Sequence, residues 1–127
     1  MRHLILLFTL ACTTSFAHAI DCNKASNTMK INECASIEQQ KVEAKLNQVY
    51  QCVLKGLEKD HASDRKFAEM KKAFVDAQLA WIKFRKAECD AVYHNNIGGT
   101  TRNAMYISCM QVRAKQRIAE LEEFEKN

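Results

Sequence analysis

The chain has 127 residues, a formal net charge of +4, 47% hydrophobic residues and no proline. This length suits one ordinary domain with one modest core, which leaves little room for a deep, multilayered active site. The positive charges are spread along the sequence rather than gathered in runs, so the electrostatic signature of a nucleic-acid-binding protein is weak.

The N-terminus has the form of a secretory signal peptide. A short basic segment precedes an apolar run at residues 4–11, and Ala17-His18-Ala19 has the A-x-A form that signal peptidase recognises. The run is too short to span a bilayer, which takes about 20 residues. We therefore expect residues 1–19 to be removed and residues 20–127 to form a single helical domain. The protein would act in the periplasm or outside the cell, with no stable membrane span.

A lipoprotein reading of the same segment is the alternative. Thr9-Leu10-Ala11-Cys12 resembles an acylation box in which Cys12 would carry the lipid, but its leucine stands one position too close to the cysteine. Simple secretion is therefore favoured. Cleavage after Ala19 removes Arg2 alone among the charged residues, leaving 18 basic against 15 acidic residues and a net charge of +3.

Cysteine usage agrees with export to an oxidising compartment. The mature chain is dense in cysteines for its length: Cys22, Cys34, Cys52, Cys89 and Cys109. It contains no C-x-x-C motif, and its histidines are only His61 and His94, which disfavours a zinc site. We expect two disulfides, one free thiol and no cofactor.

The absence of proline and the scarcity of glycine predict a mostly helical chain. The first helix is expected from Ser26 to Leu57, where apolar residues recur at steps of three, four or seven. Its predicted core stripe is Ile31, Ala35, Val42, Leu46, Val49, Val53 and Leu57.

A second and a third helix follow with the same periodicity. Ser63 can cap the second helix, with Asp64 in its first turn, and this helix should end near Tyr93. Its stripe is Phe67, Met70, Phe74, Ala77, Trp81 and Phe84, whose aromatic members are expected to be core residues. The stripe of the third helix is Ile107, Met110, Ala114, Ile118 and Leu121.

The third helix is expected to run from Asn103 to Phe124. Its acidic end opposes the helix dipole, which predicts fraying after Leu121. Short connections between three amphipathic helices predict an all-α, three-helix antiparallel bundle, stapled by disulfides.

Four of the cysteines stand where they can staple such a bundle. Cys89 and Cys109 flank the glycine-containing connection, while Cys22 precedes the first helix and Cys34 lies inside it. Four cysteines permit three pairings, and the sequence does not choose between them. The preferred pairing is Cys22–Cys34 with Cys89–Cys109, and each bridge would contribute roughly 3 kcal/mol.

An ordered set of short motifs carries a resemblance to a known family. The set is Asp21-Cys22, Ile31-Asn32-Glu33-Cys34-Ala35, Leu46-Asn47, Tyr50, Ala77-Gln78-Leu79-Ala80-Trp81-Ile82-Lys83-Phe84-Arg85-Lys86-Ala87-Glu88-Cys89, Gly98-Gly99-Thr100, Cys109 and Arg117 through Leu121. The chain thereby resembles the LprI-like lysozyme-inhibitor family over essentially its whole mature length. Ala114, where the family often has threonine, and the additional Cys52 are departures.

The resemblance implies a secreted or periplasmic helical domain in a family named for a member that inhibits lysozyme. Its motif residues here are Gln78, Trp81, Phe84, Arg85 and Arg117. Trp81 and Arg85 share a helix face and either form a patch that contacts a glycan or protein, or serve the fold. In the second case, which is favoured, Trp81 fills the core and Arg85 pairs with Asp90 or a C-terminal glutamate.

The connection from His94 to Arg102 is a candidate partner-binding loop. It offers hydrogen-bonding side chains and two glycines that permit close backbone approach: His94, Asn95, Asn96, Gly98, Gly99, Thr100 and Thr101. A disulfide at its base would preorganise it and lower the entropic cost of binding. The alternative is an ordinary helix–helix turn.

Catalysis has little support in the sequence. Cys52 is expected to be a buried, inert thiol or, alternatively, to join two chains. A cysteine–histidine enzyme would need Cys52 close to His61 or His94, with a third group to orient the base. Nothing beyond composition indicates this arrangement, so we expect no enzymatic activity.

The leading functional hypothesis is a binding protein that inhibits a lysozyme or another cell-wall hydrolase. Charge opposes it in part, because an inhibitor of a basic lysozyme gains association rate from an acidic face. The glutamates at residues 120–125 would supply one only if they lay beside the loop. The alternative is a structural or adaptor module of the cell envelope without inhibitory activity.

Overall fold

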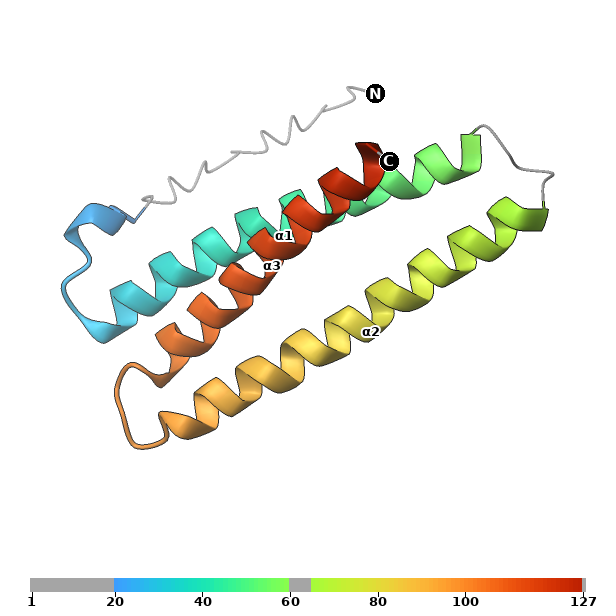
Figure 1. Cartoon of the computed structure of the whole chain (residues 1–127). Helices are drawn as coiled ribbons and strands as arrows, with labels where there is room; N and C mark the ends of the chain where they lie inside the picture. Colours follow the sequence, from blue (N-terminus) through green and yellow to red (C-terminus); the bar gives the residue numbers. More distant parts are fainter. Residues whose placement is uncertain (1–19, 60–64, 127) are drawn as a thin grey trace, which may run out of the picture.

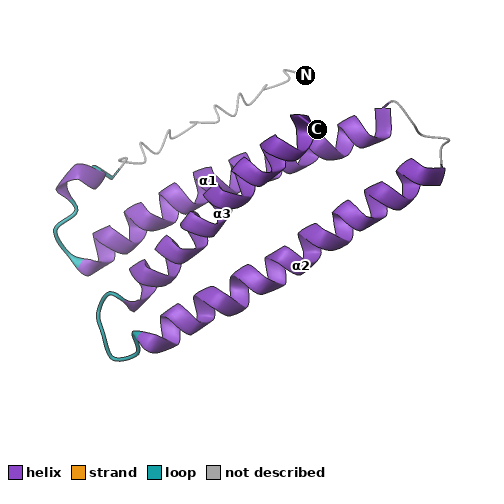
Figure 2. Ribbon diagram, in the orientation of Figure 1, coloured by secondary structure: helices purple, strands orange, loops and turns teal. Residues whose placement is uncertain are grey.

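The computed structural model describes residues 20–59 and 65–126. Within these ranges a short 3₁₀ helix, Cys22–Lys24, precedes three α-helices: α1 (Thr28–Lys59), α2 (Arg65–Asn95) and α3 (Arg102–Lys126). The helices run antiparallel in sequence order (Figure 1), and the described part contains helices and loops without strands (Figure 2). The predicted all-α, three-helix bundle is therefore confirmed.

The helix ends fall within two residues of the predicted ones. Helix α1 begins at Thr28 because the Asn27 side chain caps it, accepting a hydrogen bond from the Lys30 backbone N–H at 2.9 Å. The prediction of fraying after Leu121 is wrong, since α3 continues to Lys126. In this last stretch the Phe124 ring packs 5.2 Å from the Phe74 ring, which offsets the unfavourable charge. The expected cap at residues 63–64 lies outside the described residues.

The core lies mainly between α1 and α3, which pack together more extensively than any other pair of helices. Its buried members are Val42, Leu46, Val49, Val53, Phe74, Ala114 and Leu121. The buried stripe of α1 begins only at Val42, so Ile31, which was predicted in the core, lies outside it and is 44% exposed. Helix α2 supplies a single apolar residue to this cluster, Phe74.

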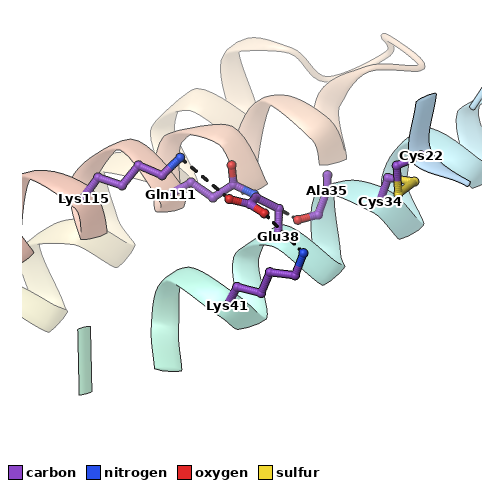
Figure 3. A network of polar contacts seen from close by, with 7 residues as sticks. All are labelled: Cys22, Cys34, Ala35, Glu38, Lys41, Gln111 and Lys115. Carbon is purple, nitrogen blue, oxygen red and sulfur yellow. Dashed lines mark hydrogen bonds and ion pairs between the residues drawn. A yellow bond between two sulfur atoms is a disulfide. The ribbon is translucent and has the colours of Figure 1, made fainter. Parts of the chain in front are cut away.

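The N-terminal half of α1 is joined to α3 by polar contacts (Figure 3). The Gln111 amide donates a hydrogen bond to the Ala35 carbonyl at 2.9 Å, and Lys115 lies 4.0 Å from Glu38. One residue before Ala35, the disulfide Cys22–Cys34 ties the lead-in segment to α1. Polar contacts thus replace apolar packing where the α1 stripe is not buried.

A second disulfide, Cys89–Cys109, joins α2 to α3. Cys89 is completely buried, whereas Cys109 is half-buried, so the bridge runs from the interior of the bundle toward its surface. The structure therefore contains the pairing that the sequence analysis preferred among three, and both staples stand near the end of the bundle that carries the α2–α3 connection.

Candidate functional site

The α2–α3 connection is a short loop organised by Asn96. Its side-chain amide donates to the Val92 carbonyl at 2.8 Å, which caps the end of α2, and its own carbonyl accepts from the Gly99 N–H at 3.1 Å. Gly98 has a φ of 91°, a left-handed backbone conformation that favours glycine. Asn96 and Gly98 therefore shape the loop rather than present groups to a partner.

The other candidate loop residues are exposed to solvent. His94, Asn95, Gly99, Thr100 and Thr101 all lie on the surface, together with Ile97, whose side chain is 63% exposed. The prediction did not include Ile97, although an apolar residue between asparagine and glycine was a readable signal. Met105, in the first turn of α3, is also exposed, so the loop end of the bundle presents apolar as well as hydrogen-bonding groups.

An aromatic cluster supports the loop from below. The Tyr93 ring contacts the Tyr106 ring edge-on, with centroids 6.3 Å apart, and the His94 ring at 5.8 Å. The Arg102 guanidinium lies 5.6 Å from the Tyr93 ring, within range of a cation–π interaction. Together with the Cys89–Cys109 bridge, these contacts fix both helix ends from which the loop emerges.

The acidic end of α3 does not lie beside the loop. Glu120 stands eighteen residues along α3 from Arg102, which corresponds to about 27 Å at the rise of an α-helix. Figure 1 shows the C-terminus and the loop at opposite ends of the bundle. These glutamates therefore cannot supply an acidic rim to a partner that sits on the loop.

The motif residues form a second cluster, centred on Trp81. The Arg85 guanidinium carbon lies 4.8 Å from the centre of the Trp81 ring, and that of Arg117 lies 5.8 Å from it. Arg117 also donates to the Gln78 side-chain carbonyl at 3.0 Å, joining α3 to α2. The sequence placed Trp81 and Arg85 on one helix face, and the structure adds Gln78 of α2 and Arg117 of α3 to them.

Arg85 has a carboxylate partner, but not one of those predicted. It is 7% exposed and donates to Glu43 of α1 at 2.8 Å. The expectation that Asp90 pairs with Arg85 is wrong. The Asp90 carboxylate instead accepts a hydrogen bond from the Lys86 ammonium, one turn earlier in α2, at 2.6 Å. That hydrogen bond, with the charge of the carboxylate, raises the pKa of Lys86 above 10.5. The expected C-terminal glutamates are also not the partners of Arg85.

The prediction that the aromatic stripe of α2 is core holds in part. Phe74 is buried, and Trp81 and Phe67 are half-buried, but Phe84 is 58% exposed. The buried face of the middle of α2 passes through Gln78 and Arg85 instead. Phe84 precedes Arg85 by one residue and is rotated away from that face by about 100°.

Glu43 also borders a shallow cleft between α1 and α2, of about 260 Å³. The α1 wall carries Glu43, Asn47 and Tyr50, and the α2 wall carries Gln78, Trp81 and Arg85; the remaining lining residues are Leu46, Leu79 and Ile82. Sequence reasoning missed the α1 wall. The signal was a polar stripe at residues 39, 43 and 47, parallel to the apolar stripe and four residues apart.

Cys52 is exposed, so the prediction of a buried thiol is wrong. Cys52 directly precedes the core residue Val53, and one residue corresponds to a rotation of about 100° around the helix axis, so the Cys52 side chain is turned to solvent. It stands 24 residues from the start of α1, about 36 Å from the end of the bundle where His94 lies. The structure therefore does not bring Cys52 and His94 together; His61 lies outside the described residues.

Neither a metal-binding cluster nor a membrane-spanning helix is found in the part of the chain that the structure describes. Over residues 20–59 and 65–126, no group of three or more potential ligands is arranged to hold a metal ion. In the same ranges, no helix has both the length and the apolarity that crossing a bilayer requires.

Comparison with known proteins identifies the family. The sequence model of the family described as "Lysozyme inhibitor LprI" matches residues 21–121. An uncharacterized protein of Rhizobium meliloti (strain 1021) is 29% identical, over 92% of this chain and 90% of the relative. No solved structure is significantly similar to the chain. The match extends from Asp21 to Leu121, across both disulfides and all three helices, and the chain belongs to the LprI lysozyme-inhibitor family.

Proposed function

We propose that the protein binds and inhibits a lysozyme-type peptidoglycan hydrolase through the loop at residues 94–102. The observation that carries this proposal is the position of the Cys89–Cys109 bridge, which closes the hairpin beneath the exposed loop. The name of the family supports inhibition, and the loop supplies a surface on which it can occur.

Preorganisation is the physical reason to choose this loop. Binding a flexible loop costs about 0.5–1.5 kcal/mol for each side chain that becomes ordered, so a loop fixed beforehand retains more of its contact energy. Asn96 fixes the loop from within, and the disulfide and Tyr93 cluster fix its two ends. The exposed groups of Asn95, Thr100 and Thr101 then remain available to a partner.

The chemistry of the loop end favours apolar and hydrogen-bonding contacts over charge attraction. Ile97 and Met105 are exposed, the loop contains no carboxylate, and the glutamates at the end of α3 lie about 27 Å away. Long-range attraction to a basic enzyme is therefore weak at this end. We expect inhibition to depend little on salt concentration.

The proposal includes export. Residues 1–19 would act as a signal peptide and residues 20–127 as the mature domain, because the two disulfides need an oxidising compartment to form and persist. Periplasmic or extracellular location is also where a peptidoglycan hydrolase would be met.

The test is an inhibition assay with the mature chain and a panel of lysozymes that includes basic and acidic enzymes. We expect at least one enzyme to lose activity at micromolar inhibitor, and Ile97→Asp to weaken that inhibition by about tenfold or more, as loss of a buried apolar anchor does. Val112→Asp is the matched control. Val112 is similarly exposed, at 50%, but stands ten residues along α3 from Arg102, or about 15 Å from the loop, so inhibition should be unchanged.

Failure of every enzyme in the panel would exclude the inhibitor function. The envelope adaptor function would then be favoured. The motif residues Gln78, Arg85 and Arg117 bond within the bundle and serve the fold under either function. Inhibition that survives Ile97→Asp in full would instead refute the assignment to the loop alone.

A further inference from the structure

The cleft between α1 and α2 has two chemically different sides. Its floor is apolar, formed by Leu46, Trp81 and the partly exposed Ile82. Its α1 rim is polar and carries Glu43, Asn47 and Tyr50, spaced four and three residues apart so that they share one helix face. A ligand that fits must therefore have an apolar face and a hydrogen-bonding edge.

The polar rim has unused hydrogen-bonding capacity. Glu43 receives both of its hydrogen bonds, from Arg85 at 2.8 Å and from Gln39 at 2.5 Å, on the same oxygen, Oε1. Among the described residues, none makes a hydrogen bond to the side-chain amide of Asn47 or to the Tyr50 hydroxyl. The rim can thus supply a carboxylate acceptor, an amide donor and acceptor, and a hydroxyl.

The side chains that form the cleft walls are already fixed by contacts within the protein. The guanidinium groups of Arg85 and Arg117 lie against the Trp81 ring, and the Tyr50 ring stacks on Phe74 with centroids 5.4 Å apart. Leu46 is 5% exposed and belongs to the core. Both walls are therefore fixed before any ligand arrives, which lowers the cost of binding.

Charge and size restrict the ligand class. Arg85 and Glu43 neutralise one another across the cleft, so neither an anion nor a cation finds an unpaired opposite charge there. The volume of about 260 Å³ lies just below the range of roughly 300–1,000 Å³ found for drug-sized ligands. One small ring fits, whereas an α-helix, about 10 Å across, does not.

We propose that this cleft binds the pyranose ring of an uncharged sugar. The C–H face of the ring would lie on the exposed side chains of Leu79 and Ile82, beside Trp81, and its hydroxyl edge would bond the α1 rim. The proposal is independent of the loop function, since the nearest cleft residue of α2, Arg85, stands ten residues from Asn95, or about 15 Å along the helix.

The chain provides its own probe, because Trp81 is its only tryptophan. Titrating the mature protein with glucose and with N-acetylglucosamine should change Trp81 fluorescence in a saturable way. A shallow cleft that holds one ring predicts a Kd on the order of 1 mM. Asn47→Ala should raise the Kd about tenfold without unfolding the protein, since Asn47 is exposed and is not a member of the buried core.

Gln48→Ala is the matched control: Gln48 is the exposed neighbour of Asn47 and is rotated away from the cleft by about 100°. It should leave the Kd unchanged. An absence of saturable change with either sugar, or equal effects of the two substitutions, would overturn the proposal. Binding of glucuronic acid more than tenfold tighter than glucose would overturn the uncharged class.

Discussion

The two ends of the bundle are stabilised in different ways. At the loop end, α2 and α3 are joined covalently through Cys89 and Cys109. At the opposite end, α2 contributes to the core through Phe74, which lies between the rings of Tyr50 and Phe124. The loop end combines a covalent staple with exposed functional groups, whereas the far end depends on aromatic packing.

The rigidity of the loop end and the stability of the whole bundle therefore depend on different contacts, the disulfide in the first case and the apolar core in the second. A chain of this size buries a modest apolar core, and α2 supplies little of it. The disulfide holds the geometry of the loop end, so that Ile97 and Met105 can remain exposed instead of being buried in a core. Three sets of substitutions test this difference between the two ends, and their expected effects on stability decrease in order.

Phe74→Ala should give the largest loss of stability, because it removes the apolar anchor of α2. Replacing a buried phenylalanine by alanine costs about 3–5 kcal/mol, which would appear as a lower midpoint in chemical denaturation. Amide hydrogen exchange should quicken at the far end of α2 before it does near Cys89. Uniform quickening along α2 would contradict the two-ended description.

Replacing Cys89 and Cys109 together by alanine should cost about 3 kcal/mol, the entropy of a loop that the bridge closes across a sequence separation of 20 residues. Here hydrogen exchange should quicken first around residues 94–102, and inhibition should weaken more than stability alone explains. Unaltered inhibition by a folded double variant would show that the loop does not need the bridge.

Asp90→Asn should have the smallest effect, because the Lys86–Asp90 pair is exposed. Asp90 raises the pKa of Lys86, so the pair stabilises the folded state below pH 10.5 and loses that contribution as the pH rises through the higher folded-state pKa. The melting temperatures of the two proteins should differ slightly at neutral pH and low salt, and converge once the pH has risen through the folded-state pKa of Lys86. A difference that persists there would point to another cause.

Periodicity predicted the fold well because α1 and α3 bury apolar residues at helical spacing. Val42, Leu46, Val49 and Val53 lie where the pattern placed them. The same reasoning misplaced Phe84, because the buried face of α2 carries polar residues whose burial depends on partners elsewhere. Arg85 is buried because Glu43 meets it, and that partner stands 42 residues earlier in the chain.

The candidate site was predictable in outline and not in its internal roles. Glycines and polar residues indicated the loop. Only the structure shows that Asn96 forms hydrogen bonds with the backbone of Val92 and Gly99, while Asn95 stays exposed. The cleft could not be predicted from either helix alone, since its polar rim lies on α1 and its apolar floor combines Leu46 of α1 with Trp81 and Ile82 of α2.

The exposed Cys52 has a consequence for how the protein acquires its native bridges. It stands eighteen residues along α1 from Cys34, or about 27 Å, whereas bridged cysteines have Cα atoms within roughly 7 Å. Once α1 has formed, Cys52 cannot exchange with the Cys22–Cys34 bridge. Before that, it competes in oxidation, and each choice of the unpaired thiol leaves three possible pairings of the others. Formation of α1 therefore protects the native Cys22–Cys34 bridge from an exchange with Cys52 that the unfolded chain permits.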